Sequence, residues 1–287
     1  MNSDGCSLPD CINATEIIPC GMMIEPYGEH SFAELKEYYK EQCQKNENAS
    51  SFMLKNMALM SDLRAGLLSC KKTGKAVYAV LNVDEEQRTT GELPADSALI
   101  TLQSMGLSAF GIEAESEDTI VDGIIRLVRF SEIPLFAKVS EKSISELKEH
   151  GITVTEKDGY AFFDISEDEK EKAFKLANER QAFFLEPDTT EISEAIPCEA
   201  NMDEILCEAS QEAFDILKIE MNSPDDALAF IQDAHMADLP VMFSCEDDIS
   251  IMLALMLYQG RALIDSTCEL DEKTLTKAVT KYGAVIY

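Results

Sequence analysis

Short apolar runs alternate with helical patterns between Phe52 and Ala114, and this alternation constrains the fold of the 287-residue chain more than any other feature. Apolar runs at 52–60, 77–81 and 109–112 are separated by segments near 62–73 and 96–105 whose apolar residues recur at helical spacing. Apolar runs without strict alternation are expected in a parallel sheet covered on both faces, with helices as the connections. The sequence therefore predicts an α/β fold.

The remaining segments extend this pattern to both ends of the chain. Residues 1–14 are expected to form an irregular leader, and Asp158-Gly159 is expected to turn a hairpin within 151–163. Further helices are expected at 31–44, 119–130, 143–149 and 166–179, and further strands at 16–24, 134–139 and 182–186. Beyond residue 198 the pattern becomes regular, with helices at 202–213, 224–236, 247–258 and 271–281, each followed by a strand. We place a weakly marked domain boundary near 197, giving units 15–197 and 198–287.

The charge balance limits the classes of partner. The chain carries 24 basic and 54 acidic residues, and the resulting formal charge of -30 opposes binding to nucleic acid and to anionic membranes. Nine cysteines occur without any Cys-x-x-Cys pair, a pattern typical of free thiols in a reducing compartment. No apolar run reaches membrane-spanning length and no signal-peptide pattern is present. We therefore expect a soluble, cytoplasmic protein.

Four segments carry a resemblance to a known family. The segments are IEPYGEHSFAELKEYYKEQ at 24–42, MSDLRAGLLSCKKTGKAVY at 60–78, DEEQRTTGE at 84–92 and LQSMGLSAFGI at 102–112. In this order and spacing the chain, over about residues 15 to 195, resembles the homocysteine S-methyltransferase family, in particular the homocysteine-binding barrel of cobalamin-dependent methionine synthase. More weakly, residues 199–287 resemble the acidic segment that follows this barrel in some methionine synthases.

The resemblance implies a fold and a reaction. The family fold is a (β/α)8 TIM barrel, here incomplete at its N-terminus and followed by an α/β C-terminal extension whose strands could close the barrel. The family reaction is methyl transfer to homocysteine, whose sulfur is activated as a thiolate on zinc. The methyltransferase resemblance therefore implies a role in methionine biosynthesis.

The zinc ligands of the family are missing from the matching positions. The family's Gly-Ile-Asn-Cys motif reads Gly-Ile-Glu-Ala at 111–114, and its Gly-Gly-Cys-Cys-Gly-Thr motif reads Phe-Leu-Glu-Pro-Asp-Thr at 184–189. The family's Glu-Thr before Met-Ser-Asp, which is expected to hold the substrate amine, reads Ala58-Leu59. The three histidines, at 30, 150 and 235, stand apart in the sequence and form no zinc-ligand pattern. We therefore predict no zinc cofactor and no catalytic residue carried over from the family.

Polar residues at the strand ends are the candidate substrate-binding set. Active sites of barrels form from the loops that follow the strands, and the residues that follow the expected strands are Asn82, Asp84, Glu113, Lys138 and Glu186. Such a group could bind an amine or a hard cation. The simpler reading is that strand ends in so acidic a chain carry acidic residues by chance.

Two functions remain open at this point. The first is a homocysteine S-methyltransferase-like protein that binds homocysteine or another small amino acid. The second is a pseudoenzyme, a non-catalytic binding or assembly partner of a corrinoid or methionine synthase module. Loss of all zinc thiolates on a retained scaffold favours the second.

Overall fold

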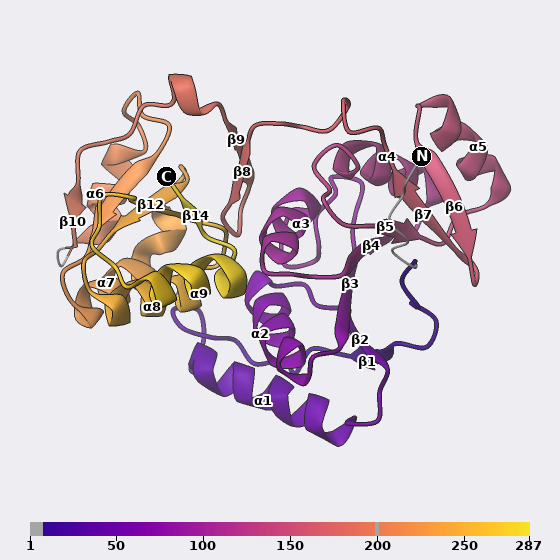
Figure 1. Cartoon of the computed structure of the whole chain (residues 1–287), viewed down its shortest axis with the longest axis horizontal. Coiled ribbons are helices and arrows are strands. Elements are labelled where there is room, and N and C mark those ends of the chain that lie inside the picture. Colours follow the sequence, from indigo (N-terminus) through magenta and orange to yellow (C-terminus); the bar gives the residue numbers. More distant parts are fainter. Residues whose placement is uncertain (1–7, 199–200) are drawn as a thin grey trace.

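The computed structural model describes residues 8–198 and 201–287 and divides the helices and strands between two lobes (Figure 1). The first lobe contains a seven-stranded sheet, ordered β1-β2-β3-β4-β5-β7-β6, in which β1 to β5 are parallel and β7 pairs antiparallel with both β5 and β6. Its elements are β1 (Thr15–Ile17), α1 (Phe32–Lys45), β2 (Ser51–Lys55), α2 (Met60–Cys70), β3 (Ala76–Asn82), α3 (Ala95–Ser104), β4 (Ala109–Glu113), α4 (Glu117–Leu127), β5 (Leu135–Ala137), α5 (Glu141–Glu149), β6 (Thr153–Lys157) and β7 (Tyr160–Asp164).

The second lobe contains a five-stranded parallel sheet in sequence order, β10 to β14. Its elements are β10 (Ile196–Pro197), α6 (Met202–Ala209), β11 (Leu217–Glu220), α7 (Pro224–Asp233), β12 (Val241–Ser244), α8 (Asp248–Leu257), β13 (Leu263–Ile264), α9 (Glu272–Tyr282) and β14 (Val285–Ile286). An antiparallel hairpin of β8 (Phe174–Ala177) and β9 (Ala182–Leu185) lies between the lobes (Figure 1). The α/β class predicted from the sequence is confirmed.

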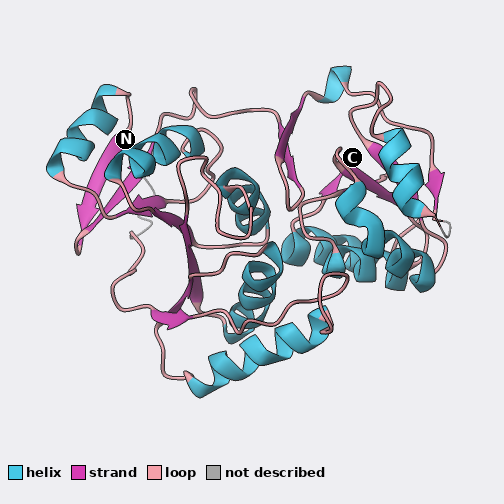
Figure 2. Ribbon diagram, turned by 180° about the vertical axis from the view of Figure 1, so that it is seen from behind, coloured by secondary structure: helices cyan, strands magenta, loops and turns pink. Residues whose placement is uncertain are grey.

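The strands of the second lobe pair with one another and not with the strands of the first. Helix α3 packs against both β8 and α9, and the view from behind also shows helices between the two sheets (Figure 2). In the described residues the C-terminal strands therefore do not add to the edge of the first sheet, although the sequence left that possibility open.

Helices cover one face of each sheet. In β3, Val77, Ala79 and Leu81 pack into the main core with the helices, whereas Tyr78 and Val80 point to the opposite face. Met53, Phe136 and Phe162, from neighbouring strands, lie on that same opposite face, and the non-helical segment around Cys11 packs against it. Both faces of β3 are buried, which explains why its sequence shows no polar alternation.

One expected helix is wrong. The charged pattern at 166–179 predicts a helix, but residues 166–173 form turns and a loop and 174–177 form strand β8. Lys170 instead contacts Asp164 at 3.3 Å and Glu167 at 2.7 Å, so these charges stabilise the turn after β7. The hairpin predicted at Asp158-Gly159 is confirmed, with both residues at positive φ.

The expected irregular leader is confirmed in part, since residues 8–14 form no helix or strand, whereas residues 1–7 lie outside the described part. The cysteines of the described ranges are all free thiols, as predicted. No helix in these ranges is long and apolar enough to cross a bilayer.

Candidate functional site

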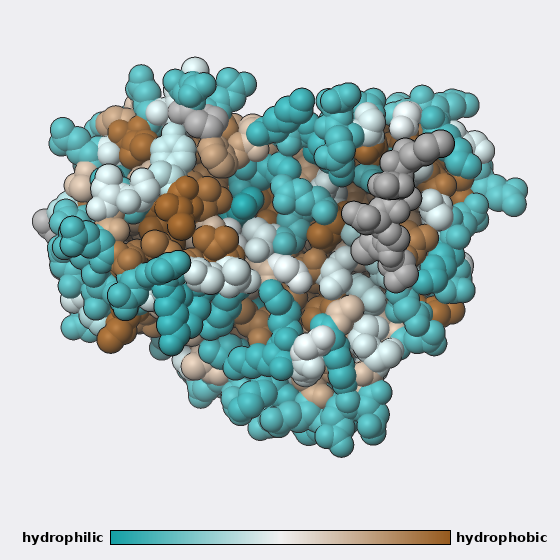
Figure 3. Space-filling view, in the orientation of Figure 1, coloured by the Kyte–Doolittle hydropathy of each residue, from teal (hydrophilic) through white to brown (hydrophobic). Residues whose placement is uncertain are grey.

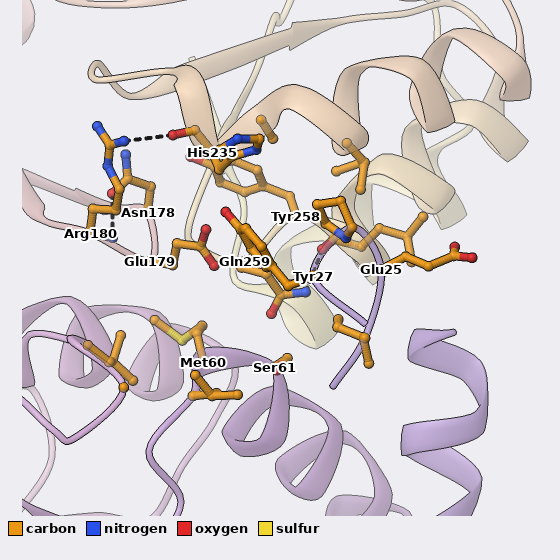
Figure 4. Close-up of a pocket in the computed structure, with 18 of the residues that line it drawn as sticks. Glu25, Tyr27, Met60, Ser61, Asn178, Glu179, Arg180, His235, Tyr258 and Gln259 are labelled. Atoms are coloured by element: carbon orange, nitrogen blue, oxygen red, sulfur yellow. Dashed lines mark hydrogen bonds between the residues drawn. The ribbon is translucent and has the colours of Figure 1, made fainter. Parts of the chain in front are cut away.

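A cavity with a volume of about 310 Å³ lies between the two lobes. Its lining comes from six segments that are distant in sequence, at 23–27, 59–61, 91–93, 178–180, 231–237 and 257–259. Figure 4 shows the start of α2, with Met60 and Ser61, on one side and His235 and Tyr258 on the other. A cavity between lobes, lined mostly by apolar side chains with a few polar groups, is the usual setting of a small-molecule site.

The turn of the β8–β9 hairpin forms one end of this cavity. The Oδ1 atom of Asn178 accepts hydrogen bonds from the backbone N–H groups of Arg180 and Gln181, both at 2.9 Å, and so closes the turn. Arg180 Nη1 donates to the His235 carbonyl at 2.8 Å, and its guanidinium also pairs with Asp238. These contacts fix Glu179, the residue between Asn178 and Arg180, at the cavity (Figure 4).

The hairpin is also anchored to both lobes. The Ser97 hydroxyl on α3 donates to the Asn178 carbonyl, and Asn178 Nδ2 donates to the Ala237 carbonyl at 3.2 Å. On the side of the second lobe, the Arg261 N–H donates to the Ala177 carbonyl at 2.8 Å. A Cβ added at Gly260 would lie 2.1 Å from that same carbonyl, so the close approach requires glycine.

Glu179 is partly buried and makes no hydrogen bond or ion pair with any described residue. Burial raises the pKa of its carboxyl group, while electrostatic interactions with His235 and Arg180 act in the opposite direction. The Tyr27 ring stacks edge-on against the His235 ring, with centroids 5.5 Å apart, and Figure 4 shows its hydroxyl pointing toward Glu179. Burial also raises the pKa of Tyr27, with a further contribution from the nearby Glu179 charge.

Tyr258 and Gln259 follow the C-terminus of α8. The Tyr258 ring is 3 % exposed and packs edge-on against Phe243, with centroids 5.7 Å apart. Burial raises the pKa of its hydroxyl, which has no hydrogen-bond partner in the described residues. Gln259 Nε2 donates to the Leu257 carbonyl at 2.6 Å, and its Oε1 has no hydrogen-bond partner in the described residues.

The sequence-predicted residues lie elsewhere, and the sheet brings only some of them together. Asn82 and Glu113 end adjacent strands and are register partners, and Glu113 lies 3.4 Å from Lys55 at the end of β2. Asn82 also lines a smaller cavity of about 140 Å³ with residues 56–58 and Thr89 and Thr90.

Three of the predicted residues serve other local structures. Asp84 accepts hydrogen bonds from the N–H groups of Glu86 and Arg88, both at 2.9 Å, and so shapes its loop. The Lys138 Nζ atom lies 4.8 Å from the centre of the Tyr160 ring, a cation–π contact. Glu186 follows β9 and so belongs to the hairpin instead of the seven-stranded sheet.

The residues present do not fit the zinc site that the resemblance implies. Glu113 is on the first sheet and Glu186 follows the separate hairpin. Among the described residues, no group of three or more His, Cys, Asp or Glu side chains is arranged to hold a metal ion.

Sequence reasoning missed the residues of the inter-lobe cavity. Glu179 falls at the end of the wrongly expected helix, and the segment at 257–261 has the pattern of a helix stop with glycine at its end. His235 stands apart from the other histidines in sequence. One feature of the sequence does point to this cavity: the polar pair Tyr258-Gln259 directly follows an apolar helix. No protein-family model matches the chain, and no curated protein matches it significantly.

Proposed function

We propose that this protein is a homocysteine S-methyltransferase-like protein, cytoplasmic and related to methionine synthase, that binds a small molecule in the cavity between its lobes without zinc-dependent methyl transfer. Homocysteine and other small amino acids are the first candidate ligands. The observation that carries this proposal is the apolar 310 Å³ cavity with the unpaired Glu179 carboxylate at one end.

The fold part of this proposal rests on strand order. Strands β2 to β5 are parallel neighbours in sequence order, each pair joined by a helix. The same order occurs in the wall of a (β/α)8 barrel, in which consecutive strands are adjacent. This order supports a TIM-barrel-related origin of the first lobe, and the second lobe repeats it in β10 to β14.

Calorimetric titration of the reduced protein with L-homocysteine, with and without one equivalent of zinc, tests the function. L-methionine serves as a second ligand. We expect binding that does not depend on zinc and that is lost in Ala234→Phe, because Ala234 lines the cavity and a phenyl group would fill it. Leu228→Phe is the control, because Leu228 is on helix α7 but 44 % exposed and outside the cavity lining. Binding that appears only with zinc would contradict the proposal.

A second candidate function, a non-catalytic assembly partner of a corrinoid or methionine synthase module, is favoured by one surface. On the helix-free face of the five-stranded sheet, Ile216, Met242 and Leu263 are buried and the hairpin packs against them. Ile286, in the edge strand β14, is 42 % exposed, and Figure 3 shows hydrophobic side chains gathered over β12 and β14. If homocysteine and methionine fail to bind, co-sedimentation with such a module is the next experiment.

A further inference from the structure

The Glu179 carboxylate lines the inter-lobe cavity and makes no hydrogen bond or ion pair with any described residue. His235 Nδ1, Tyr258 Oη and Gln259 Oε1 also have no hydrogen-bond partner in the described residues, but these three atoms are closed off from solvent and so from a molecule in the cavity. Glu179 is only partly buried, so its carboxylate is the unpartnered group that a ligand can reach.

The chemistry of this group restricts what can satisfy it. An ionised carboxylate only accepts hydrogen bonds, through two oxygens with several lone pairs. A ligand that satisfies it must bring several donors on one atom or on adjacent atoms.

The charge of the site selects a cation. Glu179 has no ion-pair partner among the described residues, and Arg180, the one arginine or lysine in the described lining, is engaged by Asp238 and the His235 carbonyl. The whole chain carries a formal charge of -30, which attracts cations toward its surface. A carboxylate or phosphate at this end would face Glu179 without a free cation beside it.

The remaining walls select an apolar body. Met60, Leu93, Ile231 and Leu257 line the cavity away from the hairpin turn. The volume of about 310 Å³ lies at the small end of the range for ligand pockets. A short aliphatic chain fits both the size and the character of these walls.

From these observations we infer that the cavity binds a primary ammonium group carried on a short apolar chain, with the ammonium at the Glu179 carboxylate. This inference rests on the proposed function of the same cavity and names the chemical class of its ligand. An ammonium group supplies three donors and one positive charge, which match the lone pairs and the charge of the unpaired carboxylate.

The test compares three ligands of equal chain length by calorimetric titration of the full chain at pH 7: n-pentylamine, 1-pentanol and pentanoate. We expect n-pentylamine to bind at least about tenfold more tightly than 1-pentanol, because charge-assisted hydrogen bonds are roughly twice as strong as neutral ones. Pentanoate should bind most weakly. In Glu179→Gln the advantage of the amine over the alcohol should fall to about twofold or less, with binding of the alcohol retained.

Glu25→Gln is the matched control, because Glu25 is also at the cavity but its carboxylate points away from it (Figure 4). This variant makes the same change in charge and should keep the tenfold preference. Equal binding of the amine and the alcohol, or tighter binding of pentanoate, would overturn the ammonium assignment while leaving the cavity as a binding site. If neither these three ligands nor the amino acids bind, both the assignment and the proposed function fail.

Discussion

Arg64 Nη2, on α2 of the first lobe, donates a hydrogen bond of 2.7 Å to the Leu255 carbonyl in the last turn of α8 of the second lobe. Its Nη1 donates to the Met256 carbonyl at 3.2 Å, and its guanidinium lies 5.7 Å from the centre of the Phe32 ring. Arg64 is fully buried, and burial lowers the pKa of its guanidinium to about 10. The C-terminal carbonyls of a helix carry partial negative charge, so α8 takes the place of a carboxylate as partner of this cation.

Replacement of Arg64 by alanine should therefore weaken the attachment of the lobes. The change leaves a cavity and two helix carbonyls without their donor, and we expect a loss of about 3 kcal/mol in the free energy of unfolding. Arg64→Met keeps most of the side-chain volume and removes the cost of a buried charge, so it should lose less than Arg64→Ala. Urea denaturation followed by circular dichroism measures both values. Equal losses in the two variants would mean that cavity formation is not the main effect.

The secondary structure of this chain was largely predictable because local patterns decide it. The apolar run of β3 and the capping box of α1, in which Ser31 and Glu34 bond to each other's backbone N–H groups, are encoded within a few residues. The helix expected at 166–179 was wrong because the charged spacing there supports salt bridges across a turn, and no apolar stripe at helical spacing accompanies it.

The candidate site could not be predicted in the same way. Glu179, His235 and Tyr258 are up to 79 positions apart in sequence and reach one cavity only because the hairpin is held against the second lobe, by contacts such as that of Arg180 with the His235 carbonyl. The strand-end rule located Asn82 and Glu113 side by side, as the register shows. It gave no information about a site formed between two separate sheets.

The stability of the protein should depend on the ionisation of Glu179. Because burial raises the pKa of this carboxyl group, the folded state holds the proton more tightly than the unfolded state does. The free energy of unfolding should therefore fall as pH rises from the unfolded pKa through the folded pKa. Glu179→Gln should be more stable than the native protein at pH 7, and this advantage should disappear below about pH 4. Thermal unfolding of both proteins, measured from pH 4 to pH 7, tests this prediction. A difference in stability between Glu179→Gln and the native protein that does not change with pH would contradict it.

The ion pair of Lys218 with Asp265 should act in the opposite direction. Burial opposes ionisation of Asp265, but hydrogen bonds from Lys218 and Thr267 lower the pKa of its carboxyl group to about 2. Its contribution is fully present above the unfolded pKa of about 4 and is lost as pH falls through about 2. We expect Lys218→Met to lose on the order of 2 kcal/mol at pH 7 and progressively less below pH 4.

Lys273→Met is the control for this prediction, because Lys273 is exposed and forms no ion pair with the described residues. Urea denaturation at pH 7 and at pH 3 measures both variants. An unchanged difference between Lys218→Met and the native protein at the two pH values would show that Asp265 is not the partner that matters.

Gly283 should be the least replaceable glycine of the second lobe. It ends α9 at φ 72°, and a Cβ at this position would lie 2.0 Å from Ser104 Oγ at the end of α3. Its carbonyl also accepts a hydrogen bond of 2.9 Å from Arg261 Nε, so the backbone has little freedom to shift. Gly283→Ala combines left-handed strain with overpacking between the lobes, and we expect a loss of roughly 3 kcal/mol in the free energy of unfolding. Gly74→Ala is the comparison, because φ is 74° but no atom lies within 4 Å, so strain alone should cost roughly 1 kcal/mol. If urea denaturation gives the same loss for both variants, the close packing of α9 against α3 does not exist in solution.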